Sequence, residues 1–159
     1  MSTAYIALGA NLDDPGATLR AAFGALANLP DSKVLVCSSL YRTAPIGCAP
    51  QPDFVNAVAA LETTLPPESL LDALLDLESR FGRIRAEKNG PRTLDLDLLL
   101  YDDQIIDLPR LTLPHPRLHL RAFVLFPLAE ICPDDFALPG RGSLAAWLPA
   151  VSNQGIIKL

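Results

Sequence analysis

The run Gly90-Pro91-Arg92-Thr93-Leu94-Asp95-Leu96-Asp97-Leu98-Leu99-Leu100 constrains the fold of this chain more than any other feature. Leucines at positions 94, 96, 98 and 100 alternate with other residues, which is the period of a half-buried β-strand. The same period places Asp95 and Asp97 together on the opposite face, with their Cα atoms roughly 7 Å apart at ~3.3 Å rise per residue. The run therefore predicts a strand with one leucine face and one carboxylate face.

The carboxylate face indicates a metal and phosphate site. Two aspartates side by side on a strand repel each other unless a cation lies between them. Mg²⁺ binds through one or two carboxylates and completes its coordination with water and substrate phosphates. Arg92, just upstream, carries a planar guanidinium that matches phosphate oxygens. The alternative is a pair of ordinary solvent-facing aspartates.

Charge and length limit the classes of protein to be considered. Half of the 159 residues are hydrophobic, which is enough for one domain over residues 1–159 with a real core. The net charge of −5 argues against a general binder of nucleic acid or membrane surfaces. The cations are nevertheless gathered, because eight of the thirteen Lys and Arg lie between Arg80 and Arg121. Such clusters are often only solvated faces, but beside a carboxylate pair this one suggests a small polyanion such as a nucleotide.

The cysteines and the apolar segments indicate a compartment. Cys37, Cys48 and Cys132 are odd in number and lack CxxC spacing, which is typical of free thiols in a reducing compartment. We see no basic leader before an apolar core and no apolar stretch long enough to span a bilayer. We therefore expect a cytoplasmic protein.

The order of elements predicts the fold class. We expect a strand over 4–8, a helix capped by Asp13 or Asp14, strands over 34–41 and 54–61, and a helix from Pro66-Pro67 to Gly82. The carboxylate strand follows, and after Tyr101 only short pieces punctuated by prolines remain. This βαββαβ order is the ferredoxin-like pattern: an α+β sandwich with a mainly antiparallel sheet, helices on one face and the site on the other.

The residues around the carboxylate strand suggest how phosphate is held. Arg83, Arg85, Lys88 and Arg92 belong to a loop that either is merely solvated or closes over phosphates as a lid. Glu78, near the end of the second helix, either pairs with an arginine or contacts the nucleotide and orients the lid. Further along, two histidines and two arginines lie in the Pro-rich segment 113–123, where phosphate binding by His115 and Arg121 becomes credible.

Two interpretations are open for Phe54, Asn56 and Phe123. They can form part of the core, although a buried amide needs hydrogen-bond partners. Alternatively, the two rings sandwich a flat heterocycle while the amide reads its hydrogen-bonding edge, with backbone groups of residues 43–46 completing the contacts.

Together the motifs resemble a known family. Tyr5-Ile6-Ala7-Leu8-Gly9-Ala10-Asn11-Leu12, Ser39-Leu40-Tyr41-Arg42-Thr43, Phe54-Val55-Asn56-Ala57, Gly90 to Asp97, and Pro114-His115-Pro116 through Arg121-Ala122-Phe123 occur in that order. This pattern is similar to that of the 6-hydroxymethyl-7,8-dihydropterin pyrophosphokinases of folate biosynthesis. The resemblance implies transfer of the terminal diphosphate of ATP to the pterin's hydroxymethyl oxygen, with release of AMP.

The resemblance also implies a role for individual residues. Asp95 and Asp97 hold two Mg²⁺ ions and, with Arg83 and Arg92, are the catalytic residues. ATP is held by Glu78, Arg85, Arg92, Leu98, Thr112, His115 and Arg121, and the pterin by Thr43, Ala44, Ile46, Phe54, Asn56 and Phe123. We expect a monomer whose partners are ATP and a reduced hydroxymethylpterin, with no nucleic acid and no membrane.

Two other classes of protein compete with this interpretation. A nucleotidyltransferase also places paired aspartates on a ferredoxin-like sheet, but it releases pyrophosphate instead of AMP. A non-catalytic RNA-recognition sheet would carry several exposed aromatic residues and a basic surface. The acidic balance of the chain and the Asp95/Asp97 pair disfavour that second class.

Overall fold

The computed structural model describes residues 1–12, 14–44, 53–82 and 94–159. In chain order its elements are β1 (Ser2–Ala10), α1 (Pro15–Ala27), β2 (Ser32–Cys37), β3 (Tyr41–Thr43), β4 (Phe54–Thr63), α2 (Pro67–Arg80), β5 (Asp95–Tyr101), β6 (Ile106–Leu108), β7 (Leu111–Leu113), the 3-10 turn η1 (Leu118–Leu120), α3 (Ala122–Ile131), β8 (Ala137–Leu138), β9 (Gly142–Ser143), the 3-10 turn η2 (Leu144–Trp147), α4 (Leu148–Val151) and β10 (Ile156–Lys158).

Local sequence signals explain where the first two helices begin and end. The Asp14 carboxylate accepts a hydrogen bond from the Ala17 N–H at 3.2 Å, and Pro15 occupies the first turn of α1. Pro67 likewise occupies the first turn of α2, but the N-cap Pro66 makes no side-chain capping bond. Gly82, with φ +79°, follows the end of α2 in the left-handed conformation that favours glycine. Both helices therefore match their prediction.

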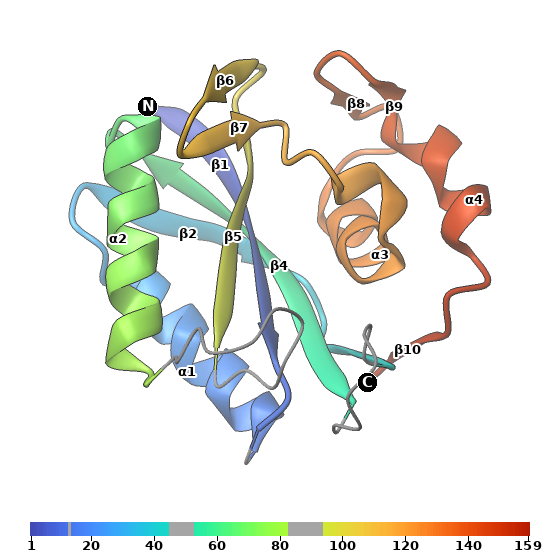
Figure 1. Ribbon diagram of the computed structural model, residues 1–159, viewed down its shortest axis with the longest axis horizontal. Coiled ribbons are helices and arrows are strands. Elements are labelled where there is room, and N and C mark those ends of the chain that lie inside the picture. Colours follow the sequence, from blue (N-terminus) through green and yellow to red (C-terminus); the bar gives the residue numbers. More distant parts are fainter. Residues whose placement is uncertain (13, 45–52, 83–93) are drawn as a thin grey trace.

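The main sheet is antiparallel, and the carboxylate strand lies at its edge (Figure 1). The strand order is β10-β3-β4-β1-β5, and β2 pairs with the other end of β4. Every described pairing in this sheet is antiparallel. Strands β4 and β1 therefore lie between β3 and β5, the strand that carries Asp95 and Asp97.

The single strand predicted over 34–41 is wrong, because the structure divides it into β2 and β3. Ser38 lies at the break: its hydroxyl accepts a hydrogen bond from Val58 N at 2.9 Å, in place of a backbone acceptor. Its own N–H donates to Val58 O at 2.8 Å. A side chain that replaces a backbone partner interrupts the ladder, so β3 forms a separate edge beside the start of β4.

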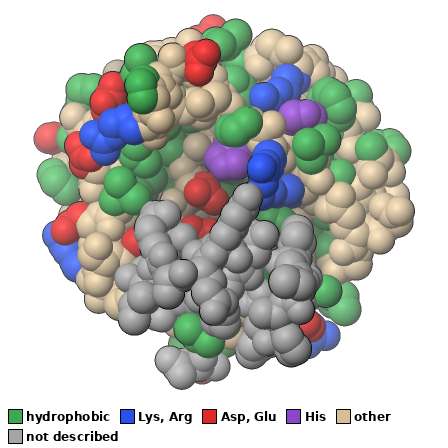
Figure 2. Space-filling model, in the orientation of Figure 1, with side chains coloured by type: hydrophobic (Ala, Val, Ile, Leu, Met, Phe, Trp, Pro, Cys, Tyr) green, Lys and Arg blue, Asp and Glu red, His purple; other side chains and the backbone are tan. Residues whose placement is uncertain are grey.

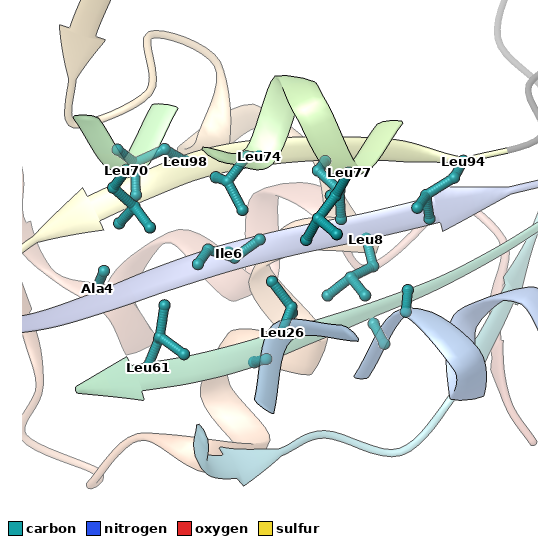
Figure 3. Close-up of a cluster of buried hydrophobic side chains, with 14 of the residues drawn as sticks. Ala4, Ile6, Leu8, Leu26, Leu61, Leu70, Leu74, Leu77, Leu94 and Leu98 are labelled. Atoms are coloured by element: carbon teal, nitrogen blue, oxygen red, sulfur yellow. The ribbon is translucent and has the colours of Figure 1, made fainter. Parts of the chain in front are cut away.

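One face of the sheet packs on α1 and α2 and forms the larger core cluster (Figure 3). Leu70, Leu74 and Leu77 of α2 recur at helical spacing and are 3% exposed or less. They lie against Leu94 and Leu98 of the carboxylate segment. This packing turns the leucine face of β5 inward and leaves Asp95 and Asp97 on the other face.

The other face of the sheet is not free of helices, so that part of the prediction is wrong. Helix α3 packs against β4 and, with Ala7, Val58 and Leu99, builds a second core cluster. In Figure 1 α3 lies on the opposite side of the sheet from α1 and α2. The sequence hides this helix because Pro127 stands inside it, where proline normally breaks the backbone hydrogen bonds.

The leucine alternation also ends earlier than predicted. A register irregularity between Tyr5 and Ile6 lets Ile6 pair with Leu98 and Tyr5 with Leu100. Leu99 and Leu100 therefore both join the α3 side of the sheet, and Leu100 does not continue the face of Leu98.

None of the described helices is both long and apolar enough to cross a membrane.

Candidate active site

The strand register brings the key polar residues into one row on the α3 face of the sheet. Asp95 lies opposite Gly9 on β1, and Gly9 lies opposite Asn56 on β4. Residues directly opposite each other on neighbouring strands project to the same face. Asn56 and Asp95 are therefore separated only by a residue without a side chain. Asp97 follows on the same face, opposite Ala7.

A pocket occupies this face and collects eight of the twelve predicted site residues that the structure describes. Its lining comprises Gly9, Thr43, Ala44, Phe54, Asn56, Asp95, Asp97, Arg117, Arg121 and Phe123. Phe54, Asn56 and Phe123 thus line one pocket together with the two aspartates. Figure 2 shows acidic, basic and histidine side chains adjoining one another near the centre of this side of the molecule.

Asn56 is held in one orientation at the floor of the pocket. It is 5% exposed, and its Nδ2 donates to Thr43 Oγ1 at 2.7 Å. Its Oδ1 lies over Gly9, where a Cβ would come within 2.9 Å. Thr43 lies in β3, directly opposite Phe54 of β4. The amide, the hydroxyl and one aromatic ring are therefore fixed together by two neighbouring strands.

Arg121 and Phe123 close the pocket from the start of α3. The Arg121 Cζ lies 5.4 Å from the centroid of the Phe123 ring, within range of a cation–π contact. Burial lowers the pKa of Arg121, and nearby Arg117 lowers it further, whereas Asp97 and Asp95 oppose the shift. A cationic group that is desolvated beside a second arginine is a favourable place for an anion.

Arg117 is a site residue that reasoning from the sequence did not single out. It is exposed, yet it lines the same pocket as Asp95 and Arg121. The sequence showed it only as one of several arginines between positions 80 and 121. The segment after β7, in which Arg117 lies, reaches the pocket only in the folded chain.

A second pocket adjoins the first at Asp97. Its lining comprises Leu71, Leu75, Leu96, Asp97, Leu98, Pro109, Arg110, Leu111, Thr112, His115 and Pro116. Leu98, Thr112 and His115, all predicted to hold ATP, thus come together between α2 and β7. Asp97 lines both pockets, so the two pockets meet at this residue.

His115 is held in a fixed turn and stays neutral at neutral pH. Burial, with Arg121 and Arg117 nearby, lowers the pKa of His115 to about 4. Its Nδ1 accepts a hydrogen bond from Arg117 N at 3.2 Å, which leaves Nε2 to carry the proton. Its backbone N–H donates to Leu99 O at 2.9 Å, and its carbonyl accepts from Arg141 Nη1 at 2.9 Å. The imidazole therefore acts as a neutral hydrogen-bond donor.

Glu78 supports the carboxylate strand. It is 2% exposed, and its Oε2 accepts a hydrogen bond from Leu96 N at 2.7 Å, between the two aspartates. Because β5 is the edge strand of the sheet, no described strand lies on the outer side of that N–H. Neither of the two pockets above is lined by Glu78. This position favours a role in holding the strand.

The donor set around Asp95 and Asp97 fits a hard divalent ion that shares its coordination with a substrate. Among the residues that the structure describes, no group of three or more His, Cys, Asp and Glu side chains comes together as a metal site. A pair of carboxylates beside an open pocket is the arrangement in which Mg²⁺ binds phosphate oxygens. Four predicted residues, Ile46, Arg83, Arg85 and Arg92, lie outside the described ranges.

Comparison with known proteins gives a consistent result. The family model described as 7,8-dihydro-6-hydroxymethylpterin-pyrophosphokinase (HPPK) matches residues 5–133. The chain is 48% identical over 155 residues to a 2-amino-4-hydroxy-6-hydroxymethyldihydropteridine pyrophosphokinase of Pseudomonas aeruginosa, covering 98% of this chain and 95% of the relative. A protein of the same name from Haemophilus influenzae is 45% identical over 159 residues, with 100% and 99% covered.

Solved structures show the same fold at low sequence identity. A structure titled HPPK-DHPS in complex with substrates aligns with a TM-score of 0.75 at 12% identity, covering 99% of this chain and 46% of the other. The HPPK-DHPS of Plasmodium falciparum aligns with a TM-score of 0.68 at 15% identity, covering 94% and 43%. This chain therefore spans less than half of those two longer chains, and the likeness concerns the fold of the shared part.

Proposed function

The chain belongs to the 7,8-dihydro-6-hydroxymethylpterin-pyrophosphokinase family, and from that membership we propose how its residues perform the reaction. The enzyme transfers the diphosphate of ATP to the hydroxymethyl group of 6-hydroxymethyl-7,8-dihydropterin in folate biosynthesis, giving the pterin diphosphate and AMP. The observation that carries the assignment of residues is the position of Asp97, which lines both pockets.

The first pocket is the proposed pterin site. Phe54 and Phe123 stack on the two faces of the flat ring system, and the Asn56 amide binds its hydrogen-bonding edge. Support comes from the bond between Asn56 and Thr43, which orients the amide before any ligand arrives. Ala44 lines the same pocket, and Ile46, also predicted to contact the pterin, lies outside the described residues. The hydroxymethyl arm then points across Gly9 toward Asp95.

The second pocket is the proposed nucleotide site. Leu98, Thr112 and the neutral imidazole of His115 bind ATP, and Arg121 meets its phosphates from the first pocket. We add Arg117 to the groups that meet phosphate, because it lines the first pocket with Arg121 and both aspartates. Arg83, Arg85 and Arg92 form the proposed lid. Glu78 serves ATP indirectly, by holding β5.

Asp95 and Asp97 would hold magnesium, for which we propose two ions. When bound there, magnesium would neutralise phosphate oxygens and lower the pKa of the attacking hydroxyl. The chain itself aligns the hydroxymethyl oxygen with the β-phosphorus, so that the bond to the α-phosphate breaks as the new bond forms. Transfer of this type requires mainly positioning and neutralisation of charge, so a dedicated protein base is not needed.

The remaining assignments are also proposals. Residues 1–159 form one ferredoxin-like domain, supported by the antiparallel order β2/β3-β4-β1-β5. The protein acts as a monomer in the cytoplasm, where Cys37 and Cys132, both free thiols, would remain reduced.

The test is a product assay. The protein is incubated with ATP, MgCl₂ and reduced hydroxymethylpterin, and the nucleotides are separated. AMP and pterin diphosphate are expected in equal amounts, whereas release of pyrophosphate would indicate a nucleotidyltransferase. Asp97→Ala should abolish AMP formation, while the matched control Asp107→Ala, an exposed aspartate on β6, should retain it. Normal turnover by Asp97→Ala would refute the metal assignment.

A further inference from the structure

The backbone on both sides of Arg121 is held by a residue far along the chain. Gln154 Nε2 donates to Leu120 O at 3.0 Å, and Gln154 Oε1 accepts from Ala122 N at 2.9 Å. One side-chain amide therefore brackets Arg121. We propose that Gln154 is a positioning residue for Arg121 in diphosphate transfer, an inference that rests on the function proposed above for Arg121.

The start of α3 needs such an external partner. Arg121 is itself the N-cap of α3, and its side chain makes no capping hydrogen bond. No acidic residue lies in the first turn. The Arg121 carbonyl already accepts from Val124 N at 3.1 Å and Leu125 N at 2.9 Å. The Ala122 N–H is one of the donors that a helix leaves open at its start, and Gln154 accepts it.

A carboxamide is the side-chain group suited to both bonds. It carries a donor and an acceptor side by side, so it can pair with the carbonyl before Arg121 and with the N–H after it. A carboxylate of the same shape can accept from Ala122 N but cannot donate to Leu120 O. Glutamate at position 154 would therefore keep the bond to Ala122 N and lose the bond to Leu120 O.

Gln154 is itself anchored on both sides. Its N–H donates to Val151 O at 3.2 Å, and Val151 is 2% exposed. Gly155, with φ +69°, then turns the chain into β10. There Ile156 pairs with Thr43, whose hydroxyl bonds to Asn56. The same short segment thus touches the start of α3 and the strand beside the pterin pocket.

The position of Arg121 matters for the reaction because it faces both aspartates. Arg121 contacts the Phe123 ring at 5.4 Å and lines the pocket with Asp95 and Asp97. A displacement of about 1 Å in a group that orients reactants can reduce the rate by roughly a hundredfold. Gln154 lies beyond residues 5–133, the part matched by the family model, so its role follows from this structure.

The test compares Gln154→Leu and Gln154→Glu with the control Ser152→Ala. Ser152 lies two residues earlier and donates only to Pro149 O of the same turn. We expect kcat to fall about tenfold in both Gln154 variants and to stay unchanged in the control. The loss is smaller than the roughly hundredfold loss for a displacement of about 1 Å, because the rest of α3 still holds Arg121. Thermal unfolding confirms that each variant is folded. Wild-type kcat in both Gln154 variants would overturn the proposal.

A double-mutant cycle with Arg121→Ala separates positioning from a general structural effect. If Gln154 acts through Arg121, Gln154→Leu should reduce kcat by less than about twofold in the Arg121→Ala background. The difference from the tenfold loss in the wild-type background is the coupling between the two residues, and its size is typical of residues in contact. An equal tenfold loss in both backgrounds would overturn the proposal. If Arg121→Ala alone retains full turnover, the function proposed for Arg121 is wrong, and the proposal fails with it.

Discussion

Substitution of Gly9 by alanine is the sharpest test of the pterin pocket. A Cβ at position 9 would come 2.9 Å from Asn56 Oδ1, whereas ordinary contacts begin at 3.4 Å. The amide must therefore move by about half an ångström. It cannot move freely, because Asn56 is 5% exposed and its Nδ2 is bonded to Thr43 at 2.7 Å.

The size of the effect follows from the bonds that the movement disturbs. A hydrogen bond of this kind contributes roughly 0.5–1.5 kcal/mol net. Misplacing the amide that binds the pterin edge should weaken pterin binding by about that amount, which is roughly 2- to 13-fold in Kd. ATP binding should be unaffected, because the second pocket does not include Gly9.

The assay is isothermal titration calorimetry with pterin and, separately, with a non-hydrolysable ATP analogue. Gly24→Ala is the matched control, because a Cβ there meets nothing within 4 Å. Gly24 lies within α1, so the control should raise the free energy of unfolding by about 0.5–1 kcal/mol and leave both affinities unchanged. Unchanged pterin affinity in Gly9→Ala, or an equal loss of affinity for both ligands, would refute the reasoning.

Three further predictions concern charged groups. Folding lowers the pKa of His115 from 6.5 to about 4. Between these two pH values the unfolded chain binds a proton at His115 that the folded chain does not bind. This residue should therefore reduce the free energy of unfolding by up to about 3 kcal/mol as the pH falls from 6.5 to 4. Urea unfolding at pH 7 and pH 4.5 should show a smaller pH dependence for His115→Asn than for wild type, and equal dependence would contradict the assignment. Arg117→Ala should raise the KM for ATP several-fold. It should also raise the pKa of His115, measured by NMR titration, because the charge of Arg117 is one cause of the lowered pKa. If neither the KM nor the pKa changes, Arg117 does not belong to the site. Glu130→Gln should lower the free energy of unfolding by about 1–3 kcal/mol, measured with urea, because the Glu130 carboxylate accepts from Ser39 N at 3.0 Å and Tyr41 Oη at 2.6 Å; an unaltered midpoint would show that these bonds contribute little.

The ends of α1 and α2 and the apolar face of β5 follow from near neighbours in the sequence. The Asp14 cap with Pro15, the Pro66-Pro67 start and the Gly82 end are local signals, and each acts within one helical turn. The alternation over 94–98 predicts which side of β5 is apolar for the same reason. These features needed no knowledge of the rest of the chain.

Other features depend on partners distant in the sequence and could not be predicted in this way. Local rules exclude a helix around Pro127, but packing of α3 against β4 outweighs them. The irregular register at Tyr5 turns Leu100 away from the face of Leu98. Ser38 divides one predicted strand into two through a bond to Val58, twenty residues away.

Residue types and spacing were enough to predict the groups of the proposed site: a carboxylate pair on a strand, arginines on both sides of it, and an amide with aromatic residues. Residue types and their spacing carry that information. Three arrangements became visible in the folded chain alone: Gly9 lies between Asn56 and Asp95, Glu78 holds β5, and Gln154 reaches the backbone around Arg121. These arrangements depend on strand register and on contacts between distant segments, which form only when the whole core is packed.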